Sequence, residues 1–284
     1  MKPAWAFIKL SRLHFLIGGV VMYAVGAISA GVESAGTYLL GQGLVTFAQL
    51  TAHYVNEYAD TATDRFIVNR TLFSGGSGVL GSGGLAPSIA LRAAQTTTLL
   101  TFGVAALAFS VSPGGAALGL LSLGVSWAYS MPPWRLLDTG WGELATSMTV
   151  AGSVPAIGAL VNGGPIVLEL LWLVAALVPI HMAMMVAFEL PDLDSDRAAG
   201  KMVLAVRIGP VNAQRLIAAL FGLAAAVGVL GTLVGDIDVT VPLAAAGLPA
   251  LVTVSAARRA RHALLTAAAV ATFVVFAVGV LILR

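Results

Sequence analysis

The chain has 284 residues, of which 58% are hydrophobic and 10% charged, with a net charge of +2 and a mean hydropathy of +0.94. Soluble proteins carry about a quarter charged residues, so this composition excludes a soluble globular enzyme, a disordered chain and a nucleic-acid-binding module. The absence of cysteine excludes disulfides, a thiol nucleophile and thiolate metal ligands. We therefore expect an integral membrane protein that contacts membrane lipid and binds no nucleic acid.

Nine stretches of the chain approach the length of about 20 mostly apolar residues that a helix needs to cross a membrane. The apolar runs are continuous rather than alternating, which predicts helices and not barrel strands. The limits of the fourth and eighth stretches are blurred by Gly114–Gly115 and by Pro249. We expect an all-α integral membrane protein with a single transmembrane domain over residues 1–284. Its predicted spans are 14–30, 36–55, 93–111, 115–130, 143–161, 166–188, 211–234, 239–256 and 263–283.

The distribution of Lys and Arg predicts the orientation of these spans. With nine spans, the N-terminus and the even-numbered loops lie on one side, which then holds every basic residue except Arg284. The short loops on the other side carry Glu33, Asp236 and Asp238. Because basic residues favour the cytoplasmic side, we expect the N-terminus in the cytoplasm of a cell that carries the protein in its cytoplasmic membrane.

Two predicted cytoplasmic loops, residues 56–87 and 189–210, each begin with acidic residues spaced by four. Residues four apart lie on one face of a helix, so each run would present a column of oxygen atoms. Two such columns without thiolates or clustered histidines suit Mg²⁺, which binds carboxylates and shares its remaining positions with substrate phosphates. A solvated helix end is the commoner explanation of one such motif, and the pairing of two motifs favours a metal site. The runs are Asn56, Asp60 and Asp64, and Asp192 and Asp196.

Three further features lie near these motifs. Residues 71–87 hold six glycines, which fits a flexible connector, a mobile lid or a cradle of backbone amides for phosphate. Residues 129–143 contain Tyr, Ser, Arg and Trp, which suit either an anion site or an interfacial anchor. His53 and His181 have no partner at metal-ligand spacing, so we expect packing or a substrate hydrogen bond rather than ligation.

The paired motifs, Asn56-x-x-x-Asp60-x-x-x-Asp64 and Asp192-x-x-x-Asp196, resemble the signature of the UbiA superfamily of intramembrane prenyltransferases. The resemblance covers nearly the whole chain and includes the nine-helix count, Arg12 before the first span and the Tyr-Ser-x-Pro-Pro sequence at 129–133. The residues that follow the two motifs, 69–78 and 196–201, look like the naphthoate prenyltransferase branch of menaquinone synthesis.

This resemblance implies a helical bundle around a central cavity and a Mg²⁺-dependent transfer of an isoprenyl chain from a polyprenyl diphosphate to an aromatic acceptor, here 1,4-dihydroxy-2-naphthoate. Cleavage of the allylic C–O bond makes a carbocation, which an apolar cavity protects from water. Asn56, Asp60, Asp64, Asp192 and Asp196 would bind Mg²⁺, with catalysis depending on Asp60 and Asp192. The diphosphate would contact Arg12, Arg70, Tyr129, Ser130, Arg135 and Lys201.

The sequence departs from the family pattern at two glutamates. Glu57 stands where many relatives carry Asp, at a position outside the ligand column, and Glu189 replaces an Asn often found in naphthoate enzymes. The extra carboxylate of Asp194 should point away from the site on a regular helix.

Several alternatives remain open at this stage. The acceptor could be 4-hydroxybenzoate, a glyceryl phosphate lipid, a tetrapyrrole or a sugar phosphate. A cation-coupled transporter would place its carboxylates near the membrane midplane at broken helices, whereas both motifs here lie at helix ends. Intact acidic columns argue against a non-catalytic assembly factor.

Overall fold

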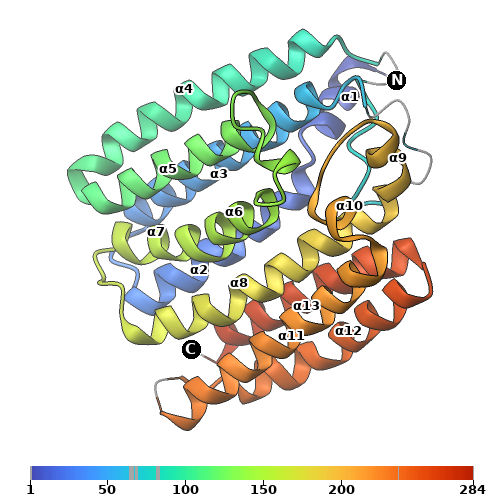
Figure 1. Cartoon of the computed structure of the whole chain (residues 1–284). Helices are drawn as coiled ribbons and strands as arrows, with labels where there is room; N and C mark the ends of the chain where they lie inside the picture. Colours follow the sequence, from blue (N-terminus) through green and yellow to red (C-terminus); the bar gives the residue numbers. More distant parts are fainter. Residues whose placement is uncertain (1, 64–66, 68–69, 81–83, 236, 284) are drawn as a thin grey trace.

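The computed structural model describes residues 2–63, 67, 70–80, 84–235 and 237–283, and these residues form an all-helical bundle without strands. Seven of its helical segments are long and apolar enough to cross a membrane. Long helices run side by side along the bundle, and several short helices, among them the N-terminal one, lie at one end (Figure 1). The helices are α1 (Pro3–Leu10), α2 (Leu16–Ala30), α3 (Ala35–Ala59), α4 (Pro87–Val111), α5 (Pro113–Ser130), α6 (Gly142–Met148), α7 (Val154–Val161), α8 (Leu168–Glu189), α9 (Leu193–Ala198), α10 (Leu204–Ile208), α11 (Pro210–Leu233), α12 (Thr240–Arg258) and α13 (His262–Ile282).

The nine predicted stretches each coincide with a long helix or a continuous helical segment. The segment predicted as 143–161 is built from α6, a π-helical turn over Thr149–Ser153 and α7. Pro155 explains the turn, because it has no N–H to donate to the carbonyl of Ala151 and so interrupts the α-helical pattern. The two stretches with blurred limits are continuous helices, because α5 begins at Pro113 and α12 runs through Pro249. α3 and α5 are not among the seven segments, so the count of nine spans stays a prediction.

Local sequence explains where several helices begin. Ser34 accepts a hydrogen bond from the backbone N–H of Thr37 at 3.1 Å and caps α3, and Ser112 caps α5 through the N–H of Gly115 at 3.1 Å. Proline occupies the first turn of α4, α5 and α11, where its missing N–H has no partner to lose. The short helices α1, α9 and α10 were not predicted, because they lie in segments without a long apolar run.

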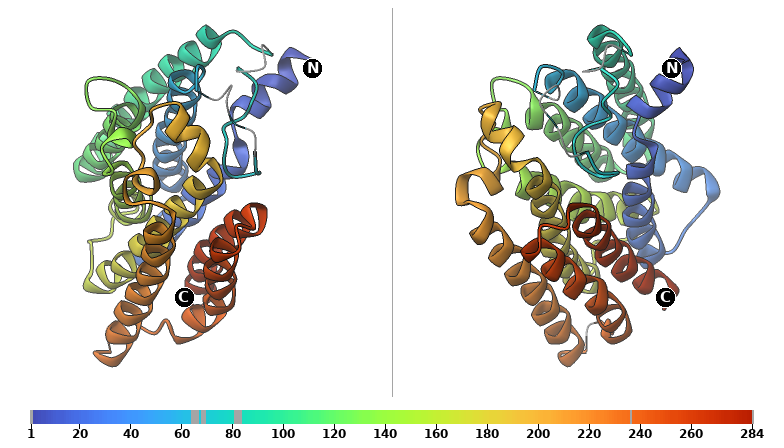
Figure 2. Two further views of the ribbon diagram at one scale, coloured as in Figure 1. Left: turned by 45° about the vertical axis from the view of Figure 1, so that its right-hand side comes forward. Right: turned by 90° about the vertical axis from the view of Figure 1, so that its right-hand side faces the viewer.

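The long helices pack around one cavity. Close pairs are α3 with α4 and α5, α2 with α7, α8 with α11, and α12 with α13. The cavity is walled by α2, α3, α5, the α6–α7 segment, α8 and α13, whereas α4, α11 and α12 contribute no lining residue. Those three helices have the smallest buried share of the seven segments, which places them against lipid on the outside. The two views in Figure 2 show the α11–α13 group on one side of the bundle and α3–α5 on the other.

Glycines allow α2 and α7 to cross at close range. A Cβ atom at Gly26 on α2 would overlap the backbone carbonyl of Pro155, and one at Gly158 on α7 would overlap the carbonyl of Tyr23. Small residues permit such backbone approach between membrane helices. This crossing fixes α7 against α2 on one wall of the cavity.

We expect Gly26→Ala to destabilise the protein by about 1–3 kcal/mol, because the added methyl group has no space and the backbone must move. Thermal unfolding of the purified protein in detergent would measure the loss. Gly103→Ala is the matched control, since a Cβ atom at Gly103 on α4 has no neighbour within 4 Å. Equal unfolding temperatures for the two variants would contradict the assigned crossing.

Candidate active site

The cavity has a volume of about 660 Å³ and a charged end. Its charged end, which we call the carboxylate end, lies where α3 and α8 finish and the short helices begin. Among the described residues, the structure brings together there both acidic motifs that the sequence placed more than 130 positions apart. The residues of the carboxylate end are Asn56, Asp60, Asp192, Asp196 and Lys201.

Lys201 lies between the two motifs. Its Nζ atom is 3.1 Å from Oδ2 of Asp60 and 3.7 Å from Oδ1 of Asp196, and its side chain is 8% exposed. The ammonium group therefore offsets the repulsion between carboxylates from different helices. In the part of the chain that the structure describes, no three acidic or histidine side chains lie close enough together to hold a metal ion.

The first motif ends its helix rather than continuing along it. Asp60 is the C-cap of α3, and Asp64, the third predicted ligand, lies outside the described residues. The side-chain amide of Asn56 donates hydrogen bonds to Oδ2 of Asp60 at 3.0 Å and to the hydroxyl of Ser130 at 3.3 Å. Asn56 thus holds Asp60 in place and joins α3 to α5.

The second motif is divided between two elements. Asp192 ends a 3₁₀ turn over Leu190–Asp192, and Asp196 lies within α9. The backbone N–H of Gly75 donates to Asp192, whose Oδ1 atom is buried without a hydrogen-bond partner, as is Oδ1 of Asp60. Asp194 points away with a 99% exposed side chain and pairs with Arg197, as its spacing predicted.

Six cationic or hydroxyl side chains were predicted to contact a diphosphate, and the structure separates them into two groups. Arg12, Tyr129 and Lys201 line the cavity. Ser130 is 1% exposed and sits behind Asn56, whereas the side chain of Arg70 packs against Gly75 and Gly78. Arg135 pairs with Asp138 at 2.9 Å and does not line the cavity. The roles of all six remain predictions.

Residues 71–80 of the glycine-rich segment fold back over the cavity and contact a buried glutamate. Glu57 accepts hydrogen bonds from the backbone N–H and the hydroxyl of Ser77 at 2.6 and 2.5 Å, and it lies 3.7 Å from the guanidinium of Arg12. Gly75 and Gly78 adopt positive φ angles of 86° and 68°, which favour glycine. The sequence did not predict this role of Glu57. The feature that could have indicated it is an ionisable residue outside the ligand column.

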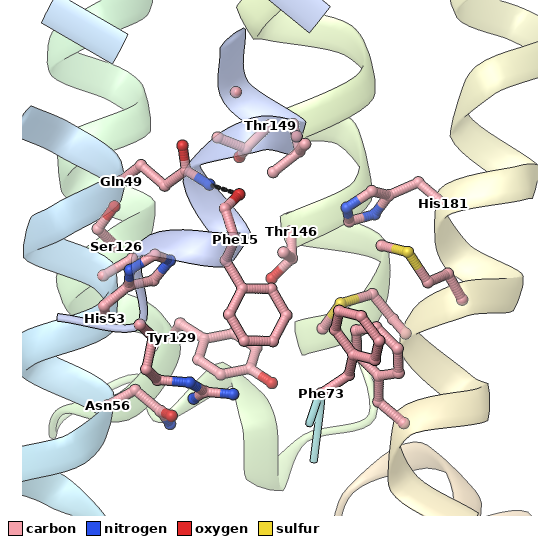
Figure 3. A pocket seen from close by; sticks show the side chains of 18 of the residues that line it. Phe15, Gln49, His53, Asn56, Phe73, Ser126, Tyr129, Thr146, Thr149 and His181 are labelled. Atoms are coloured by element: carbon pink, nitrogen blue, oxygen red, sulfur yellow. Dashed lines mark hydrogen bonds between the residues drawn. The ribbon is translucent and has the colours of Figure 1, made fainter. Parts of the chain in front are cut away.

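An aromatic cluster lies beside the carboxylate end (Figure 3). Phe73 of the glycine-rich segment stacks on Phe188 of α8 with ring centroids 6.0 Å apart, and Phe15 meets both rings edge-on at 5.9 and 6.2 Å. The guanidinium of Arg12 lies 4.5 Å from the centroid of Phe15. These rings form the apolar wall next to the charged residues.

A second network holds the loops above the site. Oδ1 of Asp138 accepts from the N–H of Met202 at 3.2 Å, and Arg207 donates to the carbonyls of Asp138 and Met202. The buried glutamates Glu143 and Glu189 accept from the N–H groups of Leu204 and Ala205 at 3.4 and 2.7 Å. Together these bonds position the 199–209 segment, and with it Lys201.

Comparison with known proteins identifies the family. The sequence matches the profile of the UbiA prenyltransferase family over residues 15–280. The chain belongs to the UbiA prenyltransferase family. It is therefore a membrane enzyme of the prenyltransferase class, and the earlier expectation of the superfamily is confirmed.

Solved UbiA structures share the fold. A homologue from Aeropyrum pernix K1 superposes with a TM-score of 0.75 at 18% identity, over 95% of this chain and 98% of that one. A homologue from Archaeoglobus fulgidus bound to GPP and Mg²⁺ has a TM-score of 0.69 at 15% identity, over 96% and 98%. A digeranylgeranylglyceryl phosphate synthase has a TM-score of 0.66 at 15% identity, over 99% of each chain. Comparison with curated protein sequences gave no significant match.

We expect Glu57→Ala to loosen the glycine-rich segment of this UbiA enzyme, because the change removes two hydrogen bonds to a carboxylate, each worth about 1.5–3 kcal/mol. Limited proteolysis should cleave within residues 71–87 at least about tenfold faster. Glu33→Ala, at an exposed glutamate in the connection between α2 and α3, serves as the control. Unchanged cleavage of the Glu57 variant would show that Ser77 does not hold the segment.

Proposed function

We propose that this UbiA enzyme transfers an isoprenyl chain from a polyprenyl diphosphate to 1,4-dihydroxy-2-naphthoate, the reaction of the naphthoate branch, with Mg²⁺ as cofactor and its site facing the cytoplasm. The observation that carries the proposal is a single cavity in which a cluster of carboxylates and a lysine adjoins a large apolar volume. A polyprenyl diphosphate has the same division into a charged head and an apolar chain.

The carboxylate end is chemically suited to Mg²⁺. Asp60 and Asp192 each keep one buried oxygen without a hydrogen-bond partner among the described residues, and hard oxygen ligands are those that Mg²⁺ prefers. Asp196 and the amide oxygen of Asn56 would complete the set, with Asp64 as a further proposed ligand. Once bound, the ion would stabilise negative charge on the diphosphate leaving group.

The chain's own residues supply the rest of the chemistry. Lys201 and Arg12 are the cationic side chains among the described cavity-lining residues, and both can contact diphosphate oxygens by small side-chain movements. Phe15, Phe73 and Phe188 keep water from the allylic carbon, and their ring faces favour positive charge near it. The acceptor ring then forms the new C–C bond and loses carbon dioxide or a proton.

The solved structures support the donor half of this proposal. Homologues from Archaeoglobus fulgidus were determined with DMAPP and Mg²⁺ and with GPP and Mg²⁺. The acceptor rests on the residues following the two motifs. Other acceptors known by class, such as 4-hydroxybenzoate, a glyceryl phosphate lipid or a tetrapyrrole, are the alternatives that an assay must separate.

Asp192→Ala should lower prenyl transfer by at least about a hundredfold, the scale seen when a group that stabilises transition-state charge is removed. Asp194→Ala is the matched control two positions away; it should stay within about twofold of the native rate because its side chain points into solvent. Initial rates at saturating Mg²⁺ would be compared, with unfolding temperatures to verify that both variants fold. Equal rates would remove Asp192 from the site.

The purified enzyme in nanodiscs should form prenylated naphthoquinol from geranylgeranyl diphosphate and 1,4-dihydroxy-2-naphthoate, and excess EDTA should abolish the product. The same donor would be offered 4-hydroxybenzoate, a glyceryl phosphate lipid and a tetrapyrrole in parallel. Product only with one of these would replace the proposed acceptor. Full activity in EDTA would refute the role of Mg²⁺.

A further inference from the structure

Three histidines line the cavity among the described residues. Nε2 of His14 lies 3.0 Å from the backbone carbonyl of Leu72, and the other two histidines are not used by the diphosphate chemistry. His53 lies on α3, one turn before Asn56, and His181 lies on α8. Both line the cavity, and Figure 3 shows them on opposite walls, with Phe15 and Thr146 drawn between them. The hydrogen bonds of each ring reveal what its other nitrogen can do.

His53 has a fixed tautomer. Its Nδ1 atom lies 3.1 Å from the backbone carbonyl of Ser11, and a carbonyl oxygen can only accept, so Nδ1 carries the hydrogen. In a neutral imidazole only one nitrogen does so. Nε2 therefore presents a lone pair. It has no hydrogen bond to a described residue, and it is not one of the buried unpaired atoms, so it is accessible. It is open to the cavity.

His181 reaches the same state through an intermediate hydroxyl. The hydroxyl of Ser147 lies 2.6 Å from the carbonyl of Glu143 and 3.0 Å from Nδ1 of His181. With its single hydrogen directed to that carbonyl, its oxygen accepts from Nδ1 of His181. Nε2 of His181 again carries the lone pair and satisfies the same two conditions as Nε2 of His53. The tautomer of His181 is thus determined by Ser147 together with the carbonyl of Glu143, and the tautomer of His53 by the carbonyl of Ser11 alone.

Three hydroxyl groups of the cavity lining donate to backbone carbonyls. Ser122 and Ser126 donate to the carbonyls of Leu118 and Ala48 at 2.8 and 3.1 Å, and Thr149 donates to Ala145 at 2.8 Å. Each of these hydroxyls donates its only hydrogen to a backbone carbonyl, so its oxygen can still accept a hydrogen bond. Among the described lining residues, the cationic side chains, Arg12 and Lys201, belong to the neighbourhood of the carboxylate end. Ser122, Ser126 and Thr149 therefore add hydrogen-bond acceptors to the cavity lining.

We propose that His53 and His181 bind the acceptor by accepting hydrogen bonds from two hydroxyl groups on opposite edges of its aromatic ring. The inference deepens the proposed function and rests on it: it assigns the acceptor class as an aromatic diol, with its hydroxyls directed to opposite walls. An aromatic acceptor with one hydroxyl group would satisfy one histidine only. Hydroxyl binding also keeps the ring electron-rich for attack on the allylic carbon.

The test measures equilibrium binding, which needs neither metal nor turnover. Calorimetry under anaerobic conditions would compare 1,4-dihydroxynaphthalene with 1,4-dimethoxynaphthalene, which has the same ring and no hydrogen to donate. The native enzyme should prefer the diol by roughly tenfold or more, as expected for two neutral hydrogen bonds. His53→Phe and His181→Phe should each weaken diol binding about three- to tenfold and leave binding of the dimethyl ether unchanged.

Two variants separate hydrogen bonding from packing. His53→Gln and His181→Gln place an amide oxygen near the position of Nε2 and should recover part of the diol preference. His262→Ala, at the start of α13 and outside the cavity lining, should change nothing. Unfolding temperatures would verify that each variant folds.

The outcomes distinguish the two proposals. Diol preference that is lost in both Phe variants supports the histidine assignment, even if the enzyme prenylates no naphthoate, in which case only the proposed function fails. Prenylation of 1,4-dihydroxy-2-naphthoate with an unchanged KM for this acceptor in both Phe variants leaves the function and overturns the histidine assignment. Equal binding of diol and dimethyl ether by the native enzyme also overturns it.

Discussion

The repulsion between carboxylates at one end of an apolar bundle is the constraint on which the rest of this structure depends. Asp60, Asp192 and Asp196 come from segments that would separate if nothing offset their charge. Lys201 lies between Asp60 and Asp196, and it stays there because buried glutamates and Asp138 hold the backbone around it. Glu57 is balanced in turn by Arg12. The short helices and loops at this end are therefore arranged by electrostatics, whereas the long helices are arranged by apolar packing.

Most of the helical framework could be predicted from the sequence, because a continuous apolar run of membrane length has few other ways to satisfy its backbone. Each predicted stretch corresponds to a helical segment, including the two blurred by Gly114–Gly115 and by Pro249. The short helices α1, α9 and α10 could not be predicted in the same way. Their sequences are too short or too polar to show a periodic signal, and contacts with the rest of the bundle decide their conformation.

The residues of the two spaced motifs could be predicted to meet, whereas contacts with partners from elsewhere in the chain could not. Asn56, Asp60, Asp192 and Asp196 were expected to meet, and the structure places them around one cavity end. Arg135 had the chemistry of an anion ligand, but Asp138, three residues later, pairs with it. Glu57 was taken as a mild substitution, and only the folded chain shows that it holds Ser77. The tautomers of His53 and His181 likewise depend on carbonyl groups that no spacing in the sequence reveals.

The π-helical turn over Thr149–Ser153 has a consequence for how this enzyme can vary. One residue of an α-helix corresponds to a rotation of roughly 100° about the helix axis, and a π turn accommodates one extra residue. Deleting a single residue from this turn would restore a regular helix. It would also rotate the face that carries Glu143, Thr146 and Ser147 relative to the face that crosses α2 at Gly158. Insertions and deletions at Ala151, Gly152 or Ser153, which do not line the cavity, therefore act as changes of register that reorient the wall next to His181.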